Sequence, residues 1–186
     1  MTKSELRTEA YRLLDKKRVP HVAGCEEEAV KLAKRYGEDT EKAATAAILH
    51  DITKRLKAEE QLELCEKYGL DNDEGELKAP KLLHAKTGAA LARDLFAIPD
   101  DVYDAIRYHT TGKPEMTLLE KIIYLADYIE PTRDFEGVEK LRKLAHKDID
   151  KAMALGLKMS LEEIRSGGGT PYKDTEDAYE YYKSYT

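Results

Sequence analysis

His50 and Asp51 are adjacent side chains of types that bind metals, and they follow the apolar run at residues 43–49. We expect the pair inside a helix of residues 40–56, with its apolar part in the core. A buried carboxylate without a partner is strongly unfavourable, so Asp51 needs a cation or several hydrogen-bond donors. Imidazole and carboxylate ligands together suit iron, zinc, manganese or cobalt better than calcium. Alone, a His-Asp dipeptide is a weak signal, because a hydrogen-bonded pair without metal explains it better.

Further histidines and a second carboxylate accompany the pair. His21 begins the preceding predicted helix, and Asp127 interrupts another apolar helix. His84 and His109 lie beside apolar residues, so four of the five histidines stand where a solvated side chain is unexpected. His146 is surrounded by charged residues and is interpreted as a surface residue or a cation at a helix C-terminus. The set predicts a metal site supported by helices.

The elements that must position these side chains are all predicted to be helices. Helical periodicity runs through nearly every segment, and alternating strand patterns are absent. The expected helices cover residues 3–17, 21–36, 40–56, 58–68, 81–95, 100–109, 117–130, 136–145, 148–165 and 175–184. Residues 71–76 and the glycine-rich run 166–172 are expected to be loops. We predict one all-α domain of residues 1–186, with a core of about 15–135 and C-terminal helices and a loop in 136–186.

Composition excludes several classes of protein. The formal net charge of −6 argues against a general nucleic-acid binder, since no overall basic field attracts a polyanion. Cys25 and Cys65 do not form a C-x-x-C pair, and such sparse cysteine fits a reducing compartment. No signal peptide or membrane span is evident, so we expect a cytoplasmic protein without membrane partners.

The order of the candidate ligands, His21, His50-Asp51, His84, His109 and Asp127, resembles the H…HD…H…H…D pattern of the HD-domain phosphohydrolase superfamily. This resemblance covers about residues 15–135. A closer similarity, to the YqeK group of symmetrical bis(5'-nucleosyl)-tetraphosphatases, extends through almost the whole chain. The segments that carry it are HVAGCEEEAVKLAKRYGEDTEKAATAAILHDITK, LLHAKTGA, IRYHTTG, LADYIEPTRDFEGVEKLR and GGGTPY.

The resemblance implies an HD-domain helical bundle that cleaves diadenosine tetraphosphate to two ADP. It implies iron as the metal, as a di-iron pair, with manganese, cobalt or zinc as alternatives. The direct ligands would be His21, His50, Asp51 and Asp127. His84 and His109 would lie beside the substrate phosphates, and ligation of a second metal is the competing role. Taken singly, each of these two is as readily a hydrogen-bonded core histidine.

Three further features complete the predicted site. Lys54 follows Asp51 by three residues, which on a helix places it on the same side, where it can hold a phosphate oxygen or pair with Asp51. An ordinary exposed lysine is the alternative. By the resemblance, Arg133 contacts the nucleotide. The loop with Gly169, Thr170 and Tyr172 allows a close backbone approach to a ligand, and Tyr172 can pack on a base. The catalytic set is then Asp51, Lys54, His84 and His109.

Two other functions stay open at the level of sequence. Another HD-type nucleotide phosphohydrolase, such as a 5'-nucleotidase, dNTPase or cyclic-nucleotide phosphodiesterase, would release different products. A non-catalytic nucleotide sensor would bind without turnover, although the full ligand set argues against it. The expected partner is a small dinucleoside polyphosphate, and the C-terminal tyrosines can serve either the core or a homodimer contact.

Overall fold

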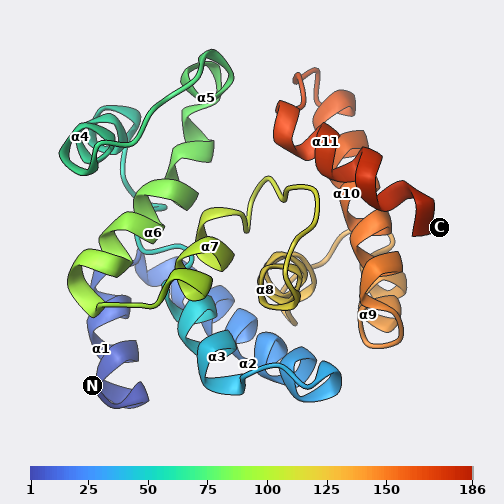
Figure 1. Ribbon diagram of the computed structural model, residues 1–186, viewed down its shortest axis with the longest axis horizontal. Coiled ribbons are helices and arrows are strands. Elements are labelled where there is room, and N and C mark those ends of the chain that lie inside the picture. Colours follow the sequence, from blue (N-terminus) through green and yellow to red (C-terminus); the bar gives the residue numbers. More distant parts are fainter. Residues whose placement is uncertain (186) are drawn as a thin grey trace.

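A computed structural model describes residues 1–185, and Figure 1 shows its helices arranged around one central helix, α8. The α-helices are α1 (Lys3–Leu13), α2 (Val19–Tyr36), α3 (Thr40–Leu49), α4 (Ala58–Tyr68), α5 (Glu74–Lys78), α6 (Leu83–Phe96), α7 (Asp100–Arg107), α8 (Leu118–Ile129), α9 (Val138–Ala145), α10 (Ile149–Ser166) and α11 (Lys173–Tyr182). Short 3-10 helices are η1 (Lys16–Arg18), η2 (Pro80–Leu82) and η3 (Lys183–Tyr185). Residues 1–185 contain no strand, which confirms the all-α prediction. None of these helices is both long and apolar enough to cross a bilayer.

Helix α8 packs against α2, α3, α7, α9 and α10, which brings segments distant in sequence to one centre. The buried apolar side chains form one cluster that extends from Leu6 in α1 to Tyr182 in α11. The core around α3 is built largely from alanines, among them Ala43, Ala46 and Ala47. Small side chains let the helix backbones approach closely, so polar side chains at the helix ends converge in the interior.

Local capping explains several predicted boundaries. Gly37 ends α2 with φ of 78°, a left-handed conformation that glycine adopts without strain. The Asp39 side chain accepts hydrogen bonds from the backbone N–H groups of Glu41 and Lys42 and so begins α3. Thr117 and Glu120 form a capping box at the start of α8. These three ends match the sequence prediction.

The first predicted helix, residues 3–17, is too long. Helix α1 ends at Leu13, because Leu14 is extended with ψ of 157°. Asp15 then caps η1, and α2 begins at Val19 with Pro20 in its first turn, where a missing N–H removes no hydrogen bond. His21 therefore lies in the first turn of α2, and Arg18 directly precedes that helix.

The predicted helix 40–56 is also too long, since α3 ends at Leu49 and residues 50–55 form turns. The Nδ1 atom of His50 lies 2.7 Å from the Ala47 carbonyl oxygen, the acceptor that the Asp51 N–H would use in a continued helix. Bonds to the third residue back replace the helical pattern, such as Lys54 N–H to the Asp51 carbonyl at 2.9 Å. His50 and Asp51 thus leave the helix axis at its C-terminal end.

Part of the predicted loop 71–76 is helical. Asp73 and Glu76 form a capping box that begins α5. Buried Lys86 of α6 holds this short helix by an ion pair of 2.5 Å to Glu76 and a hydrogen bond of 2.6 Å to the Asp71 carbonyl. Helix α5 leads through η2 into α6, so the ion pair anchors the segment that precedes His84.

The C-terminal tyrosines divide between core and surface. The Tyr182 hydroxyl is buried and accepts a hydrogen bond of 3.0 Å from the Met116 N–H. Tyr181 and Tyr185 are exposed by 38% and 40%. Tyr182 therefore belongs to the core, and the homodimer stays a prediction.

Candidate metal centre

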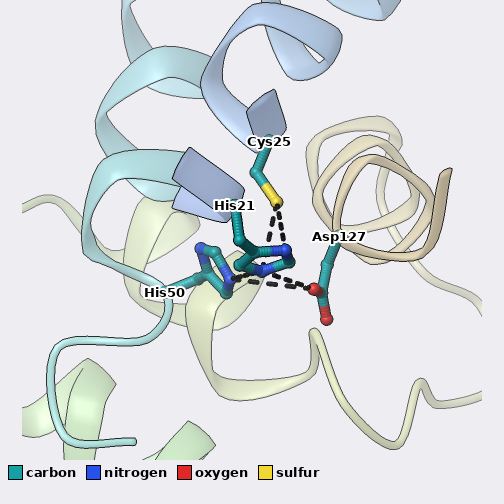
Figure 2. Close-up of side chains that lie close together, drawn as sticks. All are labelled: His21, Cys25, His50 and Asp127. Atoms are coloured by element: carbon teal, nitrogen blue, oxygen red, sulfur yellow. Dashed lines mark hydrogen bonds and ion pairs between the residues drawn. The ribbon is translucent and has the colours of Figure 1, made fainter. Parts of the chain in front are cut away.

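Three of the predicted ligands meet between α2, α8 and the end of α3 (Figure 2). His21 Nε2 lies 3.0 Å from Asp127 Oδ1 and 3.3 Å from His50 Nε2. Asp51 Oδ2 completes the group, at 3.4 Å from His50 Nε2 and 3.8 Å from His21 Nε2. All four side chains that the sequence predicts as ligands therefore point at one small volume.

The other oxygen of Asp51 faces the second pair of histidines. Asp51 Oδ1 lies 3.3 Å from His84 Nε2 and 3.8 Å from His109 Nε2. Those two nitrogens are 3.1 Å apart, and the Thr110 hydroxyl lies 3.1 Å from His109 Nε2. The Asp51 carboxylate thus stands between two histidine pairs, one on each of its oxygens.

The four imidazoles are oriented in the same way. Each Nδ1 atom faces an oxygen that only accepts hydrogen bonds, so each Nδ1 carries a proton. The acceptors are the Glu130 carboxylate for His21 and the carbonyls of Ala47, Lys81 and Ile106 for His50, His84 and His109. In the neutral rings every Nε2 therefore presents a lone pair to the cluster, the arrangement found when histidine binds a metal.

The residues present fit one or more cations. The Nε2 atoms of His21 and His50, 3.3 Å apart, would set two lone pairs against each other without a positive charge between them. Asp51 Oδ1 is buried and has no hydrogen-bond partner among the described residues. An orphaned carboxylate oxygen beside two imidazole lone pairs is a donor set for a divalent metal.

Burial and neighbouring charges shift the pKa values of the side chains in the cluster. Burial alone would raise the pKa of Asp51, but His50 and His84 hold it well below its usual range. Burial, together with the neighbouring His50 and His84, lowers the pKa of His109 to about 3. The pKa of His84 is also lowered by burial. For His50 the carboxylates of Asp51 and Asp127 outweigh burial and raise the pKa. The shifts of Asp51, His84 and His109 favour the ionised carboxylate and the neutral imidazoles that metal ligation requires, whereas the shift of His50 favours its protonated ring.

Cys25 was not predicted as part of the site. It lies one turn after His21 in α2, and its Sγ atom is 3.4 Å from His21 Nε2 (Figure 2). Possible ligand atoms of His21, Cys25, His50 and Asp127 lie within 4.8 Å of one another and could hold a metal ion, and so could those of His50, Asp51 and His109. The spacing of four residues from His21 is the signal that would have found it, since such pairs share a helix face.

Glu130, which sequence reasoning missed, orients His21. Its fully buried carboxylate accepts from His21 Nδ1 at 3.1 Å and from the Thr132 N–H at 2.6 Å. Arg142 of α9 donates to the carbonyls of Ile129 and Glu130 and so secures the end of α8. Glu130 directly precedes Pro131, so the sequence indicates only an ordinary polar residue at the end of a helix.

Gly24→Ala is expected to weaken metal binding about 10-fold, the lower end of the effect of disturbing such an orienting contact. A Cβ atom at position 24 would lie 2.5 Å from Glu130 Oε2 and 3.3 Å from Pro131 Cδ. The Glu130 carboxylate must then move, which disturbs its contact with His21 Nδ1. Overpacking of this kind costs about 1–3 kcal/mol, which outweighs the gain of up to about 1 kcal/mol from replacing a helical glycine.

Gly156→Ala is the matched control, because Gly156 is also buried in a long helix. A Cβ atom there would lie 3.5 Å from Tyr128, an ordinary contact. This variant should keep its metal and gain about 0.5–1 kcal/mol of stability. Metal titration and urea unfolding of both proteins test the expectation. Equal behaviour of the two alanine variants would contradict the role given to Gly24.

Lys54 and Arg133 both reach the cluster. Lys54 Nζ lies 3.1 Å from His84 Nε2, although the helix assumed in predicting its position ends at Leu49. Arg133 donates from Nη2 to Asp127 Oδ1 at 2.7 Å and from Nε to the Asp127 carbonyl. Arg18, which was not predicted, donates from Nε to Asp51 Oδ2 at 2.5 Å. Each of the two carboxylate ligands therefore contacts one guanidinium.

The loop of residues 169–172, which was predicted to bind the nucleotide, does not contact the cluster in the described part of the chain. Gly169 and Thr170 are exposed between α10 and α11. The Tyr172 hydroxyl donates to the Asp73 carboxylate, and its ring covers Gly75 at the start of α5. In this structure the loop therefore closes on α5.

Several known proteins are similar to this chain in sequence and fold. Residues 18–132 match the HD domain family. The chain is 39% identical to the symmetrical bis(5'-nucleosyl)-tetraphosphatase of Bacillus subtilis, over 92% of each chain. It is 44% identical to the protein of the same name from Halalkalibacterium halodurans, over 89% of each. The structure is similar to that of a predicted HD superfamily hydrolase involved in NAD metabolism from Clostridium acetobutylicum. The TM-score is 0.95 at 38% identity, covering 100% of this chain and 99% of that one.

Proposed function

Because the chain belongs to the HD-domain family and its group of symmetrical bis(5'-nucleosyl)-tetraphosphatases, we propose that it hydrolyses diadenosine tetraphosphate to two ADP. The observation that carries this proposal is the position of Asp51 between two pairs of histidine Nε2 atoms. Such a donor set suits a metal-dependent phosphohydrolase, and the relatives' names supply the substrate.

His21, His50, Asp51 and Asp127 would hold one metal, and Asp51, His84 and His109 a second. Each oxygen of Asp51 faces one group, which favours two ions over one. A bound divalent metal supplies Lewis acidity that polarises phosphoryl oxygens and acidifies water. We propose iron at both positions, with manganese, cobalt or zinc as alternatives that the same mixed nitrogen and oxygen ligands accept.

In the proposed reaction, the oxygen of a water molecule forms a bond to one of the two central phosphorus atoms. The bridging oxygen between them leaves with the other half, and a proton from the site completes the second ADP. Lys54 Nζ, 3.1 Å from His84 Nε2, is placed to donate that proton and to offset charge on the leaving oxygen. Arg133, whose fork also pairs with Asp127, binds phosphate oxygens on the α8 side.

The nucleosides occupy the outer part of the proposed site. Gly169 and Thr170 are exposed, and the Tyr172 ring would pack on a base once it leaves Gly75, so this part of the proposal rests on the resemblance of the loop. We propose one functional domain for residues 1–186, supported by the continuous core from α1 to α11, although Thr186 lies outside the described residues. Cytoplasmic location is proposed because both cysteines are free and buried, as in a reducing compartment.

Anaerobically purified, iron-loaded protein is expected to convert diadenosine tetraphosphate to ADP as the sole nucleotide product. In ¹⁸O-water, one of the two ADP molecules from each turnover should carry the label in its terminal phosphate. Chromatography and mass spectrometry measure both. Removal of the metal with a chelator should abolish turnover, and its return should restore activity.

Other products would redirect the proposal. AMP with ATP would exclude symmetrical cleavage, whereas free nucleoside or inorganic triphosphate would indicate another HD-type phosphohydrolase. Tight nucleotide binding without turnover in iron, manganese or cobalt would indicate a sensor.

A further inference from the structure

A pocket of about 310 Å³ opens beside the cluster, between η1 and the turns that follow α3. Lys17 and Arg18 line it from η1, and Lys54 and Arg55 line it from the turns. Asp51 also lines the pocket, so it is continuous with the metal centre. We call this space the cationic pocket, defined by Lys17, Arg18, Lys54 and Arg55.

The charge of the cationic pocket differs from that of the whole chain. Four cations face only two carboxylates, Asp15 and Asp51, in a protein of formal net charge −6. The side chains of Lys17 and Arg55 make no hydrogen bond or ion pair with residues 1–185. Two cations without partners, next to Arg18 and Lys54, create a local positive field suited to a compact polyanion.

Arg18 links the cationic pocket to the cluster. Its Nε donates to Asp51 Oδ2, the same oxygen that faces the Nε2 atoms of His50 and His21. Its two Nη atoms make no hydrogen bond within the described chain and are free to donate. A guanidinium has a planar set of donors that matches two phosphate oxygens, so Arg18 can bind an anion without leaving Asp51.

The length of the proposed substrate calls for such a second cationic region. Cleavage at the central bond leaves two phosphates on each side of the attacked linkage. Arg133 forms an ion pair with Asp127, and Arg18 forms one with Asp51, so each candidate carboxylate ligand has one arginine beside it. On the Asp51 side the site continues into a pocket with further unpaired cations.

We propose that the cationic pocket binds the phosphates of one nucleoside diphosphate half of the substrate, and that Arg18 is a substrate-binding residue. That the natural ligand is a dinucleotide rests on the proposed function. The affinity of the cationic pocket for a linear polyphosphate does not depend on that function. The pocket would therefore favour polyphosphate chains that extend beyond the metal centre over single phosphates.

Lys17→Ala/Arg55→Ala is the deciding variant, since neither side chain contacts a candidate metal ligand. Calorimetry on metal-loaded protein would measure binding of inorganic tripolyphosphate and of inorganic phosphate. We expect tripolyphosphate to bind about 10-fold more weakly, as the loss of two cation–phosphate contacts implies. Phosphate, which needs only the cluster, should change less than about 2-fold, within the smallest effects of exposed charges.

Arg12→Ala/Lys34→Ala is the matched control, because it removes the same charge from exposed positions outside the cationic pocket. Equal tripolyphosphate affinity of the pocket variant and this control would overturn the proposal, as would an equal loss for phosphate and tripolyphosphate. Failure of the unmodified protein to form ADP would instead overturn the proposed function, while the tripolyphosphate difference would still stand.

Discussion

Asp51→Ala is expected to lose bound metal and to reduce hydrolysis of diadenosine tetraphosphate by at least about 100-fold. Its two oxygens face two different histidine pairs, so a single change removes a ligand from both candidate metal positions. It also removes the acceptor of the Arg18 N–H. Asp127 does not face both histidine pairs, because among the four clustered histidines it contacts only His21 and His50.

Elemental analysis of the purified variant measures its metal content, and product chromatography measures its turnover. Thermal unfolding gives a third readout independent of activity. A ligand present at 100 times its dissociation constant stabilises the folded state by about 2.7 kcal/mol, so added metal should raise the Tm of the unmodified protein. The variant should show no comparable rise.

Asp101→Ala serves as the control for Asp51. The Asp101 side chain forms an exposed ion pair of 2.5 Å with Lys42 on the surface of α7. Its removal should change stability by no more than about 1 kcal/mol and leave metal and turnover unaffected. Turnover by Asp51→Ala at full metal content would contradict the role assigned to Asp51.

The sequence predicts the identity of the clustered side chains better than the backbone that carries them. His21, His50, Asp51, His84, His109 and Asp127 stand beside apolar runs, and the structure brings all six together. The end of α3 could not be predicted from periodicity, because His50 Nδ1 takes the Ala47 carbonyl from the helix. That competition depends on the ring orientation, which the tertiary contacts set.

Local signals were present at some of the missed features. The Asp73-x-x-Glu76 pattern is a capping box, and it begins α5 inside a stretch that charge alone suggests is a loop. By contrast, no local pattern connects Glu130 with His21, which are 109 residues apart. Gly24 matters only because α2 and the end of α8 come close, so its role depends on long-range packing.

Glu130→Gln is expected to weaken metal affinity about 10- to 100-fold while the fold is retained, the usual effect of losing a partner that orients a ligand. Glu130 accepts from His21 Nδ1 with one oxygen and from the Thr132 N–H with the other. A glutamine amide has only one acceptor oxygen. If it faces His21, its NH₂ group opposes the Thr132 N–H, and if it turns, it opposes the Nδ1 proton.

The same substitution at Glu28 separates an orienting role from the general effect of neutralising a buried glutamate. Glu28 is buried in α2 and pairs with a histidine at 2.6 Å, but that histidine is His146, outside the cluster. Both variants lose one buried charge and one histidine contact, so both should lose some stability. Only Glu130→Gln should lose metal affinity, because its partner His21 is a candidate metal ligand whose Nε2 atom lies beside Asp51 and Asp127. Metal titrations of the two proteins decide the matter, and equal affinities would mean that His21 is oriented by packing alone.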